Sequence, residues 1–168
     1  MRPLSRGYLK LKDTNPRSHP TLQPNYLAHP QDMLDYIQAV KLTFEIMEQA
    51  ALAPYRDGRL SPSPDIQSDA EIADWIRRNT ESAYHPCSTC RMGVDDASVV
   101  DPMTCKVHGL EHLRVVDASI MPDEASGNLN APTIMMAERA ADLIQGRPGL
   151  PASTADVWVP PEWETRQR

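Results

Sequence analysis

The chain has 168 residues, enough for one domain with a single ordinary core, and a net charge of −6 at pH 7. An acidic chain without a run of lysine and arginine is not expected to bind nucleic acid. No apolar stretch reaches the ~20 residues that a membrane helix needs, and residues 1–7 contain no apolar signal segment. Three cysteines, an odd number, argue against a secreted disulfide framework and favour a reducing compartment.

The first third of the chain predicts a strand followed by a helix. Residues 8–12 alternate leucine with lysine, as a half-exposed strand does, and turn residues follow them. Residues 31–50 carry apolar side chains at helical spacing, which gives the predicted helix one apolar face: Leu34, Ile37, Val40, Phe44 and Met47. Pro30 suits the first position of that helix, and Asp32 lies in its first turn, where the helix dipole favours an acid.

A second helix is predicted after a loop. Residues 51–67 are rich in proline, glycine and aspartate, which is typical of a loop. Ser68 and Glu71 then have the spacing of a capping box, in which each side chain bonds to the other residue's backbone. We therefore expect the helix to start at Ser68 and to end near Asn79.

The second half of the sequence contains fewer regular patterns. Residues 94–109 are polar and irregular, and residues 113–117 are predicted to form a short buried strand that ends in an acid. Pro132 suits the first position of a last helix, which Gly146 is expected to end. The proline-rich residues 148–168 are expected to form a strap over the surface or a disordered end.

One of the five histidines, His85, lies in the segment that also carries two of the three cysteines. It directly precedes a proline, so the chain is expected to be extended there. Oxidising an alcohol by hydride removal requires that the hydroxyl proton be taken, and an imidazole can do this near neutral pH. The amide of Asn128 could hold the same oxygen, and a helix N-terminus at Pro132 and Thr133 could stabilise a flavin anion. From the residues alone, a hydrogen-bonded structural role for His85 is favoured over a catalytic one.

The cysteines indicate a second kind of site. Cys87-x-x-Cys90 and Cys105-x-x-His108 have the spacing of a four-ligand zinc ribbon, and thiolates with imidazole suit tetrahedral zinc. A redox-active pair is less favoured, because no thioredoxin-like strand and helix surround it. The cysteines can also be small buried apolar residues.

The sequence resembles the C-terminal part of the glucose–methanol–choline (GMC) flavoprotein oxidoreductases. The resemblance covers roughly residues 3–147. It is carried by Ser5–Gly7, Pro24–Leu27, Tyr84–Gly93, Val99–Pro102, Val107–Leu110, Leu113–Pro122 and Ser126–Glu138. It implies oxidation of an alcohol by hydride transfer to FAD, with choline converted to betaine aldehyde on the way to glycine betaine.

The resemblance also implies roles for individual residues. His85 falls on the family's active-site histidine, the proton acceptor, and Asn128 falls on its second active-site position. Five residues fall where the last strand and helix of the family pass the flavin: Asp117, Ala118, Asn130, Pro132 and Thr133. In the family the positions of the cysteines and His108 are not a metal site, which lowers the weight of the zinc interpretation.

The implied fold is α+β, with a mixed or antiparallel sheet covered by helices and an incomplete domain. Residues 1–83 would belong to the substrate-binding domain, residues 84–147 would return into the FAD-binding domain, and residues 148–168 would form the tail. Family members are about three times as long, and their N-terminal half carries the glycine-rich dinucleotide-binding turn, which this sequence lacks. We therefore expect this chain to be a fragment that needs that half as a partner and is inactive alone.

Partners and location follow from the same resemblance. The expected partners are choline and the missing FAD-binding half, and peripheral association with a membrane is a further expectation. The expected location is the cytoplasm or the inner face of the cell membrane in a bacterium, and the mitochondrion in a eukaryote. A small zinc-binding module and a catalytically dead structural fragment stay open as alternatives.

Overall fold

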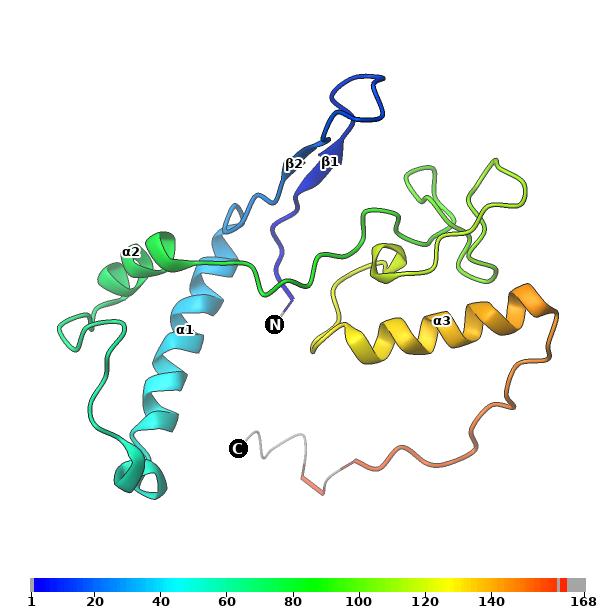
Figure 1. Ribbon diagram of the computed structural model, residues 1–168. Coiled ribbons are helices and arrows are strands. Elements are labelled where there is room, and N and C mark those ends of the chain that lie inside the picture. The colour runs from blue at the N-terminus through cyan, green and yellow to red at the C-terminus, as the bar shows by residue number, and fades with distance from the viewer. Residues whose placement is uncertain (1, 160, 163–168) are drawn as a thin grey trace.

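The computed structural model describes residues 2–159 and 161–162 (Figure 1). Its helices and strands occur in the order β1 (Tyr8–Lys10), β2 (Thr21–Gln23), α1 (Pro30–Met47), the 3-10 helix η1 (Ala50–Tyr55), α2 (Asp69–Asn79), the 3-10 helix η2 (Ala118–Ile120) and α3 (Asn130–Gln145). Residues 2–79 are called the helical half below, and residues 84–147 the loop half.

The two strands form an antiparallel pair in which Leu9 lies opposite Leu22. Every residue of both strands is exposed, and Figure 1 shows the pair extending away from the helices. The α+β class and the antiparallel pairing are confirmed. In the described residues, however, no helix covers the pair, so Leu9 and Leu22 remain about half exposed or more, at 48% and 63%.

The core of the helical half lies between α1 and α2. Helix α1 starts at the expected proline and contributes buried Ile37, with Val40 packed beside it. Helix α2 contributes Ile72 and Ile76, each 1% exposed. The predicted apolar face of α1 is only partly buried: Leu34, one of its residues, is 55% exposed.

The predicted capping box at the start of α2 is confirmed. Glu71 N–H donates to Ser68 Oγ over 3.3 Å, and Ser68 N–H donates to a Glu71 carboxylate oxygen over 2.9 Å. The bonds from Ser68 lower the pKa of Glu71. The loop predicted before this helix contains η1, a short 3-10 helix that the sequence did not predict.

The loop half is held together by isolated bridges and one long helix. Val100 bridges to both Met92 and Val107, and it is fully buried in a second core with Cys105 and Ile120. The strand predicted at residues 113–117 was wrong. That segment makes a single bridge, between Lys106 and Arg114, because no further strand of the described chain lies beside it.

Helix α3 closes the second core with Ala140, which is 1% exposed. The helix begins at Asn130, so Pro132 occupies its third position instead of the predicted first. The N–H groups of the first turn have no partner within a helix, so a proline is tolerated at this position as well. Gly146 ends the helix as predicted, with a left-handed φ of 66°. Ile134 and Met135 on α3 remain exposed.

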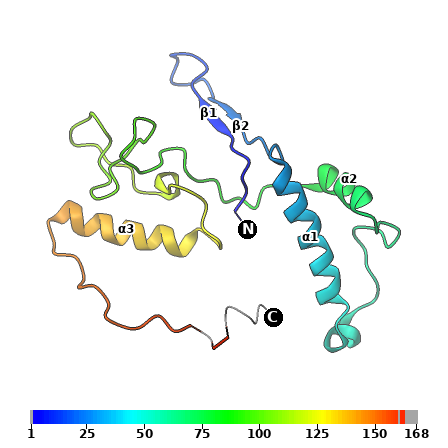
Figure 2. The ribbon, with the colours of Figure 1, turned by 180° about the vertical axis from the view of Figure 1, so that it is seen from behind.

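The two halves have separate cores, and no residue is shared between them. Figures 1 and 2 show α1 and α2 on one side of the N-terminal segment and α3 on the other. The accessible surface is 13,792 Å², whereas a compact protein of 18.8 kDa exposes about 8,300 Å². The chain therefore leaves open much surface that a complete domain would bury.

Two further expectations concern the tail and the membrane. Residues 148–159 form no helix or strand and are exposed. The rest of the predicted proline-rich tail falls largely outside the described residues. Among the described helices, none has both the length and the apolarity that crossing a membrane requires.

Candidate active site

The segment that carries His85 follows α2 and forms the start of the loop half. The imidazole is half-buried, and Pro86 after it is exposed. Tyr84 and Ser88, on either side, have positive φ angles of 59° and 69°, which are uncommon for residues other than glycine. Such strained backbone is often found at functional sites, because surrounding contacts must hold it in place.

Three backbone hydrogen bonds fix this segment beside η2. Ser88 N–H donates to the carbonyl of Ala118 over 3.4 Å, Cys90 N–H to that of Ser119 over 2.9 Å, and Met92 N–H to that of Ile120 over 2.8 Å. Because Ile120 is fully buried, the last of these bonds is anchored in the second core. The structure therefore lays the chain after His85 against the turn that contains the predicted residues Asp117 and Ala118.

Asp117 has a structural task in this turn. Its side chain accepts a hydrogen bond of 2.8 Å from the N–H of Ser119 and so caps η2. One carboxylate oxygen is therefore engaged locally, while the residue remains exposed. Ala118 is half-buried, and its carbonyl accepts the bond from Ser88.

The loop from Pro122 to Asn128 leads from this turn to α3. It is anchored at its two ends by the buried side chains of Met121 and Leu129, which are 4% and 5% exposed. Asn128 is exposed, and within the described part of the chain its amide has no hydrogen-bond partner. The amide is thus free to bind a ligand.

The N-terminus of α3 is open, unlike those of the other two α-helices. Side chains cap α1, through His29, and α2, through Ser68, but none caps α3. The Thr133 hydroxyl does not serve as a cap, because it donates to the carbonyl of Leu129 over 2.6 Å. The first N–H groups of α3 have no partner within the helix, and the helix dipole gives this end a partial positive charge.

The zinc-ribbon spacing is not matched by the geometry of its residues. Cys105 is buried in the second core, where desolvation raises the pKa of its thiol. A ring nitrogen of His108 lies 3.0 Å from the carbonyl oxygen of Gly93. Within the described residues, no three His, Cys, Asp or Glu side chains are grouped as a metal ion would require.

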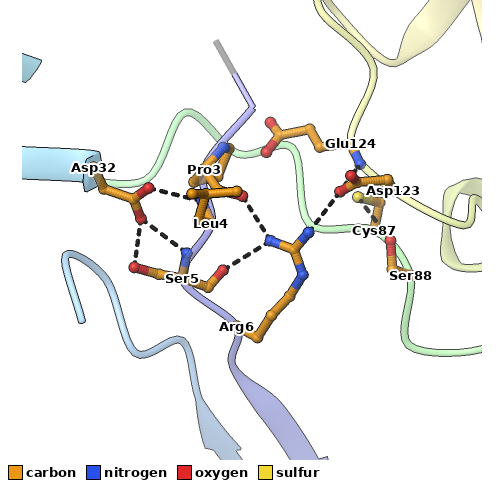
Figure 3. Close-up of polar contacts among 9 residues, drawn as sticks. All are labelled: Pro3, Leu4, Ser5, Arg6, Asp32, Cys87, Ser88, Asp123 and Glu124. Carbon is orange, nitrogen blue, oxygen red and sulfur yellow. Dashed lines mark hydrogen bonds and ion pairs between the residues drawn. The ribbon is translucent and has the colours of Figure 1, made fainter. Parts of the chain in front are cut away.

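A polar junction at the N-terminus was missed in the sequence. Asp32, buried at 7% exposure, accepts hydrogen bonds from the N–H groups of Leu4 (2.7 Å) and Ser5 (2.9 Å) and from the Ser5 hydroxyl (Figure 3). Burial raises the pKa of Asp32, but the bonds from Ser5 and Leu4 together lower it below its usual range. The only sequence signal was an acid in the first turn of a helix, which the helix dipole alone explains.

Comparison with known proteins gives this arrangement a family. The C-terminal family model of the GMC oxidoreductases matches residues 3–137. The oxygen-dependent choline dehydrogenase of Pseudomonas aeruginosa is 54% identical over 159 residues, which cover 95% of this chain and 28% of that protein. The mitochondrial choline dehydrogenase of Homo sapiens is 54% identical over 162 residues, covering 95% and 27%.

A solved structure is also similar to this chain. The crystal structure of pyridoxine 4-oxidase from Mesorbium loti matches with a TM-score of 0.80 at 32% identity, over 88% of this chain and 29% of that one. The chain spans a little over a quarter of the length of the curated relatives. The resemblance read from the sequence is confirmed: the chain belongs to the GMC oxidoreductases and corresponds to their C-terminal portion.

Proposed function

We propose that this chain supplies the proton-accepting and alcohol-positioning side chains of a choline-oxidising FAD enzyme. The observation that carries the proposal is the three-bond pairing of residues 88–92 with residues 118–120, which joins the segment after His85 to the turn that leads to α3. The relatives named choline dehydrogenases support choline as the substrate and betaine aldehyde as the product. The enzyme would act on the CH–OH group of its donor.

His85 would accept the hydroxyl proton of the alcohol. Loss of this proton builds negative charge on the oxygen, and that charge favours departure of the hydride from carbon. A positioned base of this kind contributes roughly 10²–10⁴ in rate. The half-burial of His85 leaves its ring accessible to a small substrate.

Asn128 would hold the alcohol oxygen. Its NH₂ group can donate a hydrogen bond to that oxygen in both the neutral and the deprotonated state, and it cannot compete for the proton. The exposed amide, without another partner in the described residues, is suited to this task. Together, the two residues would position one oxygen from two sides.

FAD, when bound, supplies the hydride acceptor. The open N-terminus of α3 fits a group that becomes negatively charged, since N–H groups and the helix dipole both favour an anion there. Asn130, Pro132 and Thr133 in its first turn, with Asp117 and Ala118 at the start of η2, would line this contact. The Thr133 hydroxyl is bonded within the helix, so this residue would contribute through its backbone position.

The domain assignment also belongs to this proposal. Residues 1–83 would be part of the substrate-binding domain, residues 84–147 part of the FAD-binding domain, and residues 148–168 a tail. The chain would work together with polypeptide that carries the dinucleotide-binding turn. The excess of exposed surface and the two separate cores support this need for a partner. Since the relatives include a bacterial and a mitochondrial protein, we propose the bacterial cytoplasm or inner membrane face, or the mitochondrion, as the location. Peripheral membrane association is part of the same proposal.

A reconstitution experiment tests the proposal. The chain would be produced together with the N-terminal remainder of the Pseudomonas aeruginosa relative, and the purified complex assayed for bound FAD and for choline oxidation with an artificial electron acceptor. We expect His85→Ala to reduce turnover by about 10²–10⁴ at saturating choline. The control is His112→Ala, since the His112 side chain is 96% exposed.

The outcomes separate the candidate functions. Unchanged turnover in His85→Ala would remove this residue from the mechanism. Stoichiometric FAD without any turnover in the wild-type complex would favour a catalytically dead structural fragment. Zinc in the purified chain, measured by elemental analysis, would return the metal-binding module to consideration.

A further inference from the structure

A single polar side-chain contact connects the two halves of the chain. Arg6 Nη2 lies 3.0 Å from Asp123 Oδ1, although the two residues are 117 positions apart in the sequence. Between residues 2–79 and residues 84–147, all of which the structure describes, this is the one hydrogen bond or ion pair. The two cores share no residue either, so apart from the linking residues 80–83 this contact is the one polar tie that the structure shows between the two described halves.

The guanidinium of Arg6 is also held by hydrogen bonds within its own segment. Its other terminal nitrogen, Nη1, donates to the carbonyls of Pro3 (2.6 Å) and Ser5 (3.1 Å), as Figure 3 shows. These two bonds fix the plane of the group and direct Nη2 towards Asp123. Less side-chain entropy is then lost when the ion pair forms than in an ordinary exposed pair.

The segment that carries Arg6 is itself fixed to α1. Asp32 in the first turn of this helix binds the N–H groups of Leu4 and Ser5, and the Ser5 hydroxyl accepts a bond of 2.9 Å from the N–H of His29. Arg6 therefore extends from a rigid base.

The partner of Arg6 lies in the loop that carries Asn128. Asp123 is the second residue of the loop from Pro122 to Asn128, and its Oδ1 also accepts the N–H of Glu124 over 2.9 Å. Within the described residues, this loop makes no other hydrogen bond or ion pair to a different segment. Between its two buried ends, the loop is thus held at one point.

We propose that Arg6 is a positioning residue that, through Asp123, holds the loop bearing Asn128 in place between the two halves. Its link to the reaction rests on the role proposed for Asn128. Loss of the contact frees the middle of the loop while both cores stay intact. A lysine at this position can reach Asp123 but cannot also form the two fixed carbonyl bonds, because it lacks the planar fork.

Hydrogen exchange of the 168-residue chain, resolved by segment, tests the proposal directly. We expect the amides of residues 123–128 to exchange about two- to five-fold faster in Arg6→Met and in Asp123→Asn than in the wild type. Arg6→Lys should give an intermediate increase. The double variant should exchange no faster than the faster single variant, because both substitutions break the same contact.

Arg77→Met is the matched control. Arg77 pairs with Asp74 over 2.8 Å at exposures of 59% and 65%, close to the 59% and 49% of Arg6 and Asp123. That pair lies within α2, so its loss should leave exchange in residues 123–128 unchanged. Exchange in α2 and around Val100 reports folding in the same data. Equal loop exchange in Arg6→Met and the wild type, or an equal increase in Arg77→Met, would overturn the proposal.

The reconstituted enzyme separates this inference from the proposed function. If Arg6 acts through Asn128, Arg6→Met raises the KM for choline and has no further effect in an Asn128→Ala background. A loop that loosens in Arg6→Met while Asn128→Ala keeps full activity supports the positioning contact and removes Asn128 from the mechanism. A loop that does not loosen refutes the contact's role, whatever the activity of Asn128→Ala.

Discussion

The helical half and the loop half each form a small core, but they form it from different elements. The helical half packs α1 on α2, and a side chain caps the N-terminus of each helix. The loop half surrounds Val100 with isolated bridges and backs them with the single helix α3, whose N-terminus no side chain caps. In the first arrangement the backbone hydrogen bonds and caps lie within each helix, whereas in the second the bridges around Val100 join separate loop segments. The uncapped helix end and the exposed amide of Asn128 both lie in the second arrangement.

The largest effect should come from opening either core. Ile76 and Ile120 are 1% and 0% exposed, so Ile76→Ala and Ile120→Ala should each lower the free energy of unfolding by about 2–4 kcal/mol. Because the cores share no residue, Ile76→Ala should speed hydrogen exchange in α1 and α2 and spare residues 100–120. Ile120→Ala should do the reverse.

Leu60→Ala serves as the control for both, since Leu60 is 97% exposed and should change nothing. Faster exchange of both halves in either core variant would show that they unfold as one unit. The two halves would then have no separate free energies of unfolding to compare.

A smaller effect is expected at the junction on α1. Asp32→Asn keeps the shape of the side chain but removes the negative charge on the oxygens that accept bonds from Leu4 and Ser5. This should lower the free energy of unfolding by about 1–2 kcal/mol at neutral pH. The pKa of Asp32 is lowered in the folded chain, so its contribution is present above the unfolded pKa, near 3.8, and is lost as the pH falls further.

Chemical denaturation between pH 7 and pH 2.5 measures this difference. The gap between the wild type and Asp32→Asn should be constant above about pH 5 and should narrow as the pH falls below 3.8 and through the lowered pKa of the folded chain. A gap that stays constant across the whole range would show that the charge of Asp32 does not matter, and that the loss of one accepting oxygen does.

The two halves also differ in how far their sequences predicted them. The start of α1 at Pro30 and the capping box of Ser68 and Glu71 were predicted because their signals lie within one helical turn. The strand at residues 113–117 was wrongly predicted, since a strand requires a partner that its own sequence does not specify. The zinc-ribbon spacing gave no information about the fold that buries Cys105.

The candidate site shows the same limit. His85 and Asn128 were named through a family resemblance, and their roles remain predictions. The pairing of residues 88–92 with 118–120 joins segments about thirty positions apart, and no periodicity in either segment indicates it. Arg6 was invisible as a contact residue because its partner lies 117 positions away.

The smallest effect concerns the caps. Ser68→Ala removes the acceptor for the Glu71 N–H and should cost about 1 kcal/mol, the usual value of an N-cap side chain. The loss should be confined to the first turn of α2, whose amides should then exchange as readily as those of the first turn of α3. If the wild-type first turns of α2 and α3 already exchange alike, the missing cap of α3 has no effect on that helix. Anion binding would then be the one remaining role for the uncapped end of α3. Titration of the reconstituted enzyme with FAD measures that binding.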